Sequence, residues 1–133
     1  MENVIDALRE NATPQSFPIE LPDEDMLVVI EEEILLPIPF SVRLFLLNVS
    51  DLVVGSIEPV TASDPNSHTH LPEVTAQAWA DGLPRDLLPI CQVGADYYCT
   101  DQNGLIKLWS EGEMQKEQWE NIWRWAEEIW LRS

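Results

Sequence analysis

Hydrophobic and polar positions follow two periods along this chain, and these periods separate helical from extended segments. Apolar residues at helical spacing predict short helices over 2–12, 23–35, 40–48 and 72–80. Short runs rich in β-branched and aromatic residues predict strands over 52–60, 87–93, 96–101 and 105–109. The last three strands are closely spaced, so we expect them to form a meander.

Local signals support the helix boundaries. Asp23 precedes the second helix, where its side chain can cap the free backbone N–H groups. Pro39 suits the first turn of the third helix. That helix carries an apolar stripe that predicts a buried central position, namely Val42, Phe45, Leu46 and Val49.

The C-terminal segment 113–131 carries the clearest helical pattern. One predicted face is apolar and rich in tryptophan: Trp119, Ile122, Trp123, Ala126, Ile129 and Trp130. A second face places Glu120, Arg124, Glu128 and Arg132 at i+4 spacing, which predicts a ladder of ion pairs. We therefore expect one long helix here.

The turn at Asn103-Gly104 sets the predicted register of the last two strands. Asn-Gly favours a two-residue type I′ turn, which would place Tyr98 opposite Trp109 and Cys99 opposite Leu108. Tyr98 and Trp109 would then share one face with Lys107. Either this face is free and suits protein binding, or the helix 113–131 covers it and packs its tryptophans on Tyr98 and Trp109.

These elements predict an α+β fold in which a central, mostly antiparallel sheet of about four to five strands packs against helices. With 133 residues the chain fits one domain, 1–133, in which 1–20 form an N-terminal helix and connector. No apolar run is long enough for a transmembrane helix, and the first residues lack a signal-peptide pattern. The expected location is the cytoplasm.

Charge is the most unusual property of the composition. The chain has 24 acidic residues against 7 basic ones, a net charge of −17. Such a charge repels nucleic acid and anionic membranes and attracts basic partners. The alternative is that the charge serves only to keep the protein soluble. The run Glu31-Glu32-Glu33 has no basic i+4 neighbour. It forms either a solvated helix face or the contact surface for a cationic partner.

Two cysteines, Cys91 and Cys99, fall on consecutive predicted strands. A two-residue turn between the strands pairs Cys91 with Tyr98, whereas a three-residue turn could set Cys91 opposite Cys99. In a reducing compartment, buried free thiols are the expected state rather than a disulfide.

Motifs for catalysis are missing from the sequence. It contains no Gly-rich phosphate loop, no Gly-x-Ser-x-Gly elbow and no Cys-x-x-Cys. His68 and His70, with Asp64 and Glu73, have the residue types of a zinc site but match no ligand spacing. Asp96, Asp101 and Glu111 fall at strand and turn ends, where acids are normally solvated. We expect no enzyme activity, no metal and no cofactor.

The order of several motifs resembles the SMI1/KNR4 (SUKH) superfamily. The Glu-rich helix 30–34, the break Leu36-Pro37-Ile38-Pro39 and the helix Phe40–Asn48 are similar to the first half of its pattern. Leu83-Pro84 with 87–90, then Asp96–Asp101 and Gly104–Trp109, resemble its strand motifs. Asn48 is followed by Val49-Ser50-Asp51 instead of the family's two glycines, so that loop is expected to differ.

This resemblance implies an α+β fold and a non-enzymatic role. Many bacterial members are immunity proteins that neutralise toxins, often nucleases, and fungal members are regulatory scaffolds. The resemblance and the charge together predict a protein that binds a basic toxin domain, with a regulatory interaction module as the alternative. Our predicted binding surface comprises Glu31, Glu32, Glu33, Asp96, Tyr98, Asp101, Trp109 and Glu111.

Overall fold

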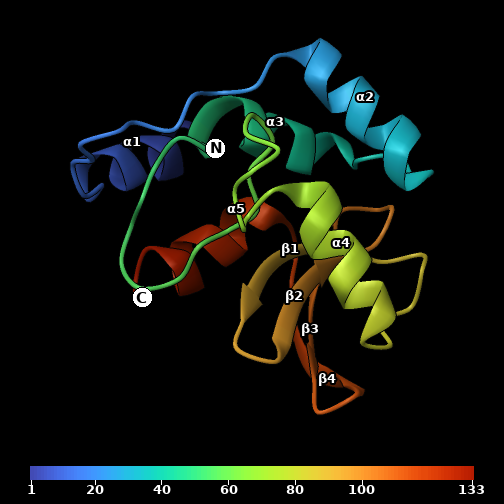
Figure 1. Cartoon of the computed structure of the whole chain (residues 1–133). Coiled ribbons are helices and arrows are strands. Elements are labelled where there is room, and N and C mark those ends of the chain that lie inside the picture. Colours follow the sequence, from blue (N-terminus) through green and yellow to red (C-terminus); the bar gives the residue numbers. More distant parts are fainter.

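A computed structural model describes all residues of the chain, 1–133, in which four helices precede the sheet and a C-terminal helical segment follows it (Figure 1). The elements, in order, are α1 (Glu2–Glu10), α2 (Glu24–Ile34), α3 (Phe40–Val49), α4 (Leu71–Ala80), β1 (Leu88–Val93), β2 (Asp96–Thr100), β3 (Ile106–Ser110), β4 (Glu113–Trp119), α5 (Ile122–Trp125) and the π-helical turn η1 (Ala126–Trp130). The predicted α+β class is confirmed.

The four strands form one antiparallel sheet in the order β1-β2-β3-β4. On one face, Tyr97 donates its hydroxyl to Asp81, just beyond the end of α4, over 2.8 Å. On the other face, the Tyr98 ring lies 5.4 Å from the Trp125 ring of α5. Helices thus cover both sides of the sheet, as Figure 1 shows for α4 and α5.

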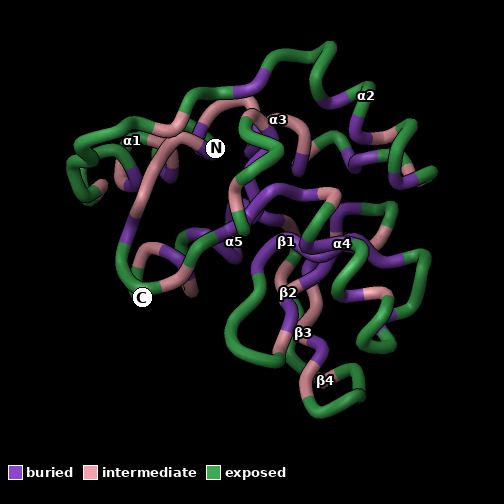
Figure 2. Tube along the Cα trace, in the orientation of Figure 1, coloured by how far each residue is buried: buried purple, intermediate pink, exposed green.

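The centre of the core is aromatic. The ring of Phe45 in α3 contacts three tryptophans from the C-terminal segment, Trp123, Trp125 and Trp130, at centroid distances of 5.6, 6.5 and 5.4 Å. Phe45 is fully buried, which confirms α3 as the predicted buried helix. Figure 2 shows the buried stretches converging between α3, α5 and the sheet, while the outer side of α2 is exposed.

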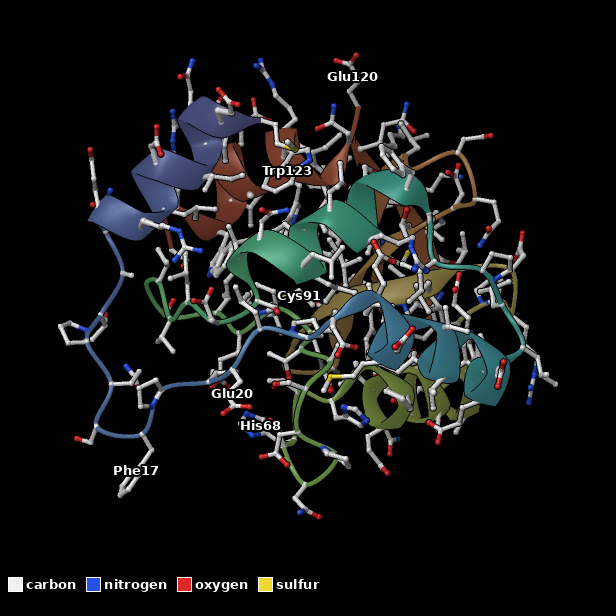
Figure 3. All side chains as sticks on the ribbon, turned by 90° about the horizontal axis from the view of Figure 1, so that it is seen from above. Phe17, Glu20, His68, Cys91, Glu120 and Trp123 are labelled. Carbon is white, nitrogen blue, oxygen red and sulfur yellow. The ribbon has the colours of Figure 1, made fainter.

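The predicted long C-terminal helix, 113–131, is wrong in nearly its first half. Residues 113–119 form β4, which pairs with β3, and the helix begins at Ile122. Asn121 caps it by accepting a hydrogen bond from the Arg124 N–H over 2.9 Å. Because Glu120 lies before this cap (Figure 3), the predicted four-residue ladder is reduced to Arg124 with Glu127 and Glu128.

The β2–β3 register differs by one residue from the prediction. Tyr98 lies opposite Leu108, and Tyr97 opposite Trp109. The Asp101 N–H donates to the Leu105 carbonyl, so the turn has three residues, 102–104. Of these, Gly104 takes a positive φ, of 87°, which is typical of a three-residue hairpin with a bulge.

The predicted strand over 52–60 is an irregular segment. Its end touches the sheet through a bridge between Pro59 and Cys91 and through the Val60 N–H, which donates to the Ile90 carbonyl. Gly55 lies in a turn with a φ of 60° rather than in a bulge. None of the helices has the length and hydropathy that a membrane crossing requires.

Candidate protein-binding surface

Three of the predicted acidic residues, Asp96, Asp101 and Glu111, lie at two ends of the sheet. Asp96 begins β2 and accepts a hydrogen bond from the Ser110 hydroxyl (2.8 Å), next to Glu111 in the β3–β4 turn. Asp101 follows the other end of β2, where Gln102 donates to the Pro37 carbonyl (3.0 Å) between α2 and α3. The structure therefore places only Asp101 on the same side as Glu31, Glu32 and Glu33.

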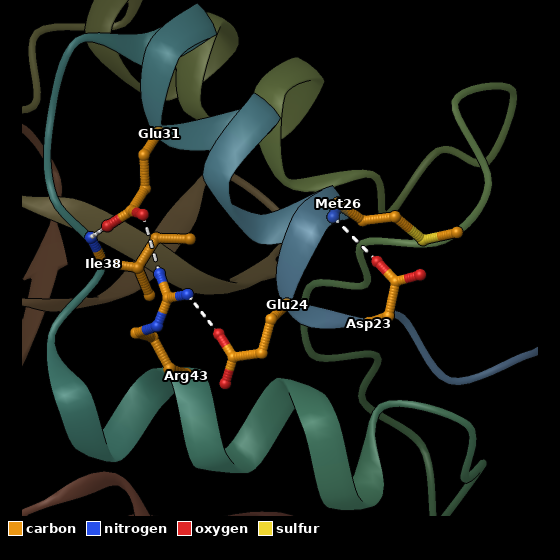
Figure 4. Close-up of polar contacts among 6 residues, drawn as sticks. All are labelled: Asp23, Glu24, Met26, Glu31, Ile38 and Arg43. Carbon is orange, nitrogen blue, oxygen red and sulfur yellow. Dashed lines mark hydrogen bonds and ion pairs between the residues drawn. The ribbon is translucent and has the colours of Figure 1, made fainter.

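Glu31 has a structural partner on another element. Its carboxylate accepts hydrogen bonds from the Ile38 N–H and from Arg43 of α3, both over 2.7 Å (Figure 4). Arg43 also pairs with Glu24. Burial alone would lower the pKa of Arg43, but its hydrogen bonds to Glu24 and Glu31 raise it. The run of three glutamates indeed has no basic i+4 neighbour on its own helix, but Glu31 has a basic partner, Arg43, on the next helix.

Asp101 also performs a local task. Its Oδ1 accepts hydrogen bonds from the Asn103 and Leu105 N–H groups, over 2.9 and 3.0 Å, and Lys107 lies 3.8 Å from its Oδ2. These bonds fix the three-residue turn as an Asx-type turn. The carboxylate is thus committed to the hairpin.

The two predicted aromatic anchors are covered. Trp109 is only 7% exposed and packs on Tyr97, with ring centroids 6.0 Å apart. Tyr98 is half-buried between Trp119 and Trp125. The alternative, that C-terminal tryptophans cover the face, holds for Tyr98, whereas Trp109 points to the opposite face because of the register shift. The prediction that Trp109 is an exposed binding residue is therefore wrong.

Unpaired acids and exposed apolar side chains follow one another in the chain where α2 ends and α3 begins. Glu32 and Glu33 are exposed and take part in no ion pair. Leu35 and Phe40, close by in the chain, are 87% and 75% exposed. We call these four residues the α2–α3 corner. Exposed apolar residues ringed by charge are typical of protein interaction sites.

Leu35 holds its exposed position at a backbone cost. It takes a φ of 57°, a left-handed conformation that leucine rarely adopts. The hydrogen bond from the Ile38 N–H to Glu31 fixes the chain three residues later and stabilises this break. Sequence reasoning missed both apolar residues. The available signal was that Leu35 and Phe40 fall off the stripes that bury α2 and α3.

A groove adjoins this corner between the end of α2 and α4. It has a volume of about 380 Å³, and its lining includes Glu33, Leu35, Glu73, Thr75, Trp79 and Arg85. The Trp79 indole N–H donates to the Leu87 carbonyl (2.9 Å), and the Arg85 guanidinium lies 5.4 Å from the centre of its ring. The groove thus combines carboxylates with an apolar wall.

The residues of the zinc-like set lie in different surroundings. His68, exposed, pairs with Glu58 over 2.7 Å, and Asp64 accepts a hydrogen bond from the Asn66 N–H. His70 is buried at the start of α4. No group of three or more His, Cys, Asp or Glu side chains gathers where it could hold a metal ion.

Both cysteines are buried and free. Cys91 lies opposite Tyr98, as the two-residue turn predicts, and Cys99 pairs with Pro89 after a shift of register. Burial raises the pKa of each thiol to about 12. The prediction of core thiols is confirmed, and these groups are protonated and shielded.

The fold and this surface define a small acidic α+β protein with features of a protein-binding domain. A sequence model of a family described as "SUKH_5: SMI1-KNR4 cell-wall" matches residues 1–131. The chain belongs to this family, which confirms the SMI1/KNR4 resemblance.

A solved structure described as a protein from Pseudomonas syringae pv. tomato has the same fold. It shares 55% sequence identity with this chain, with 100% of both chains covered and a TM-score of 0.97. No curated protein sequence matches the chain.

Proposed function

We propose that this chain is a non-enzymatic immunity-type protein of the bacterial cytoplasm, which binds a basic, nuclease-type toxin domain and blocks it. One observation carries the proposal: an excess of acidic residues leaves Glu32 and Glu33 unpaired beside exposed Leu35 and Phe40. This combination supplies both electrostatic attraction and apolar contact area.

The charge supports a basic partner. A nuclease must attract phosphate, so its active-site surface is positively charged. An inhibitor with a net charge of −17 gains faster encounter and complementary contacts with such a surface. Membership of a family with many immunity proteins supports the same role.

A regulatory or scaffold module without a toxin partner is the second candidate. The description of the matching family, which refers to the cell wall, favours it. Such a module would bind a cellular protein and would protect no cell against a toxin.

The direct test is a pull-down with the protein encoded beside its gene, followed by co-expression of the two. We expect a basic partner whose toxicity is suppressed by this chain and whose binding weakens with salt. A neighbouring protein that is acidic or harmless, or rescue that needs no binding, would contradict the proposal.

A further inference from the structure

The groove between the end of α2 and α4 has polar groups without partners. The Thr75 side chain is fully buried at its floor, and its hydroxyl Oγ1 has no hydrogen-bond partner. Buried hydroxyls almost always have a partner, so this one is free to pair with a ligand in the groove.

The charges of the groove are unbalanced by one. Glu33 and Glu73 line it and take part in no ion pair, while Arg85 is the one base among its lining residues. One additional cation would balance two carboxylates and one guanidinium. The guanidinium of Arg85 already lies over the ring of Trp79, so the groove accommodates a group of this kind.

The walls suit a side chain that is apolar along its stem and charged at its tip. Leu35 and Trp79 provide apolar surface, and the carboxylates of Glu33 and Glu73 are exposed. Lysine and arginine bury their methylene stems on apolar surface in this way while the charged head keeps polar contacts. A charged N–H donor also makes strong hydrogen bonds to carboxylates.

We infer that this groove binds one lysine or arginine side chain of the protein partner. The stem lies against Leu35, the cationic head lies near Glu33 and Glu73, and one of its N–H groups donates to Thr75 Oγ1 once the Thr75 side chain turns towards the groove. This inference rests on the proposed function and names the chemistry that its surface recognises.

The first test uses short peptides and needs no identified partner. Gly-Arg-Gly and Gly-Lys-Gly are titrated into the ¹⁵N-labelled protein up to about 20 mM, which detects millimolar affinity, with Gly-citrulline-Gly as the uncharged control. We expect saturable NMR shifts at Thr75 and Trp79 with at least one cationic peptide and none with citrulline. The inference is overturned if neither cationic peptide shifts the signals of Thr75 and Trp79, or if Gly-citrulline-Gly shifts them equally.

Variants with matched charge separate the groove from the general acidity. Glu33→Gln with Glu73→Gln is compared with Glu10→Gln and Glu113→Gln, two exposed acids on α1 and β4. We expect the groove variant to lose at least about tenfold in peptide affinity, and the control to keep it. Equal loss in both overturns the inference.

Thr75→Val tests the hydroxyl without changing the shape of the floor. We expect weaker peptide binding and an unchanged or higher unfolding midpoint, since no hydrogen bond is lost on substitution. Unchanged peptide binding would remove the hydroxyl from the site and overturn its assigned role.

The same variants distinguish this inference from the proposed function. A basic toxin that binds the groove variant as tightly as the control variant overturns the groove while the proposed function stands. Cationic peptides that bind the groove when no toxin partner exists overturn the proposed function while the groove stands.

Discussion

At the scale of single residues, Glu31 and its two neighbours in the same run have different tasks. Glu31 joins α2 to α3 through Ile38 and Arg43, whereas Glu32 and Glu33 face solvent without partners. Three consecutive glutamates thus divide into one structural residue and two that are free for recognition. The sequence shows the run but not this division, because the guanidinium that selects Glu31 comes from another helix.

Replacing Glu31 with alanine should therefore destabilise the fold, and replacing Glu32 should not. Loss of the hydrogen bonds to the Ile38 N–H and to Arg43 should lower the unfolding free energy by about 2 kcal/mol. The matched Glu32→Ala change should stay within about 0.5 kcal/mol of the unaltered protein. Urea unfolding measures both, and equal effects would contradict the division.

The buried thiols predict a loss of stability in alkaline solution. An unfolded thiol loses its proton near its ordinary pKa of 9.0, while burial raises the pKa of Cys91 and Cys99 to about 12. Between these values the unfolded state binds fewer protons, so the unfolding free energy falls as pH rises from 9 towards 12. Each thiol contributes a slope of about 1.4 kcal/mol per pH unit.

Unfolding curves collected over this range check the slope. Cys91→Ala and Cys99→Ala should each make it shallower, because each removes one group that titrates differently in the two states. A slope that neither substitution changes would show that the thiols are not protected by burial.

At the scale of elements, the sequence predicts α1 to α4 and β1 to β3 well because each has its own period and its own boundary signals. The error at 113–119 has a physical cause. The helical spacing of the tryptophans is real from Ile122 onwards, but β4 is an exposed edge strand whose residues bury little. With little burial there is no alternation to reveal a strand.

The position of the β2–β3 turn was predicted correctly, but its length was not. Asn-Gly alone favours a two-residue turn, whereas the hydrogen bonds from Asn103 and Leu105 to Asp101 stabilise a three-residue one. This shift moved Trp109 from the predicted surface to the core. Leu35 and Phe40, which are exposed, were missed because apolar residues are normally counted as buried.

The turn can be tested by substitution. Gly104→Ala should destabilise the protein by at least about 1 kcal/mol, since Gly104 has a φ of 87° and an added Cβ would lie 3.0 Å from Ser41 Oγ. Asn103→Ala should cost less, because Asn103 does not take a positive φ here. Thermal unfolding compares the two, and a larger cost at Asn103 would favour the type I′ turn.

At the scale of the whole molecule, the fold separates structural from free charge. Arg43 and Arg9 are used in pairs that join helices or loops, which leaves most acids uncompensated. The resulting field surrounds an exposed apolar corner and a groove with an unpaired hydroxyl at its floor. In the proposed function, long-range attraction and short-range contact would therefore act at the same place.

The apolar part of this surface gives a prediction independent of charge. Leu35→Ala and Phe40→Ala remove exposed side chains, so each should change the unfolding free energy by no more than about 0.5 kcal/mol. Each should nevertheless weaken partner binding by about tenfold, because in our account both side chains contact the partner. Surface plasmon resonance measures the loss, with Phe17→Ala as control, since Phe17 is 91% exposed on the N-terminal connector, away from this corner (Figure 3).

The central claim is recognition of a basic protein through the acidic corner. Its most direct test is the dissociation constant of the complex with the protein encoded beside the gene, measured between about 50 and 500 mM salt. Our account predicts a basic partner and binding that weakens at least about tenfold over this range. A neutral or acidic partner, or an affinity independent of salt, would contradict it.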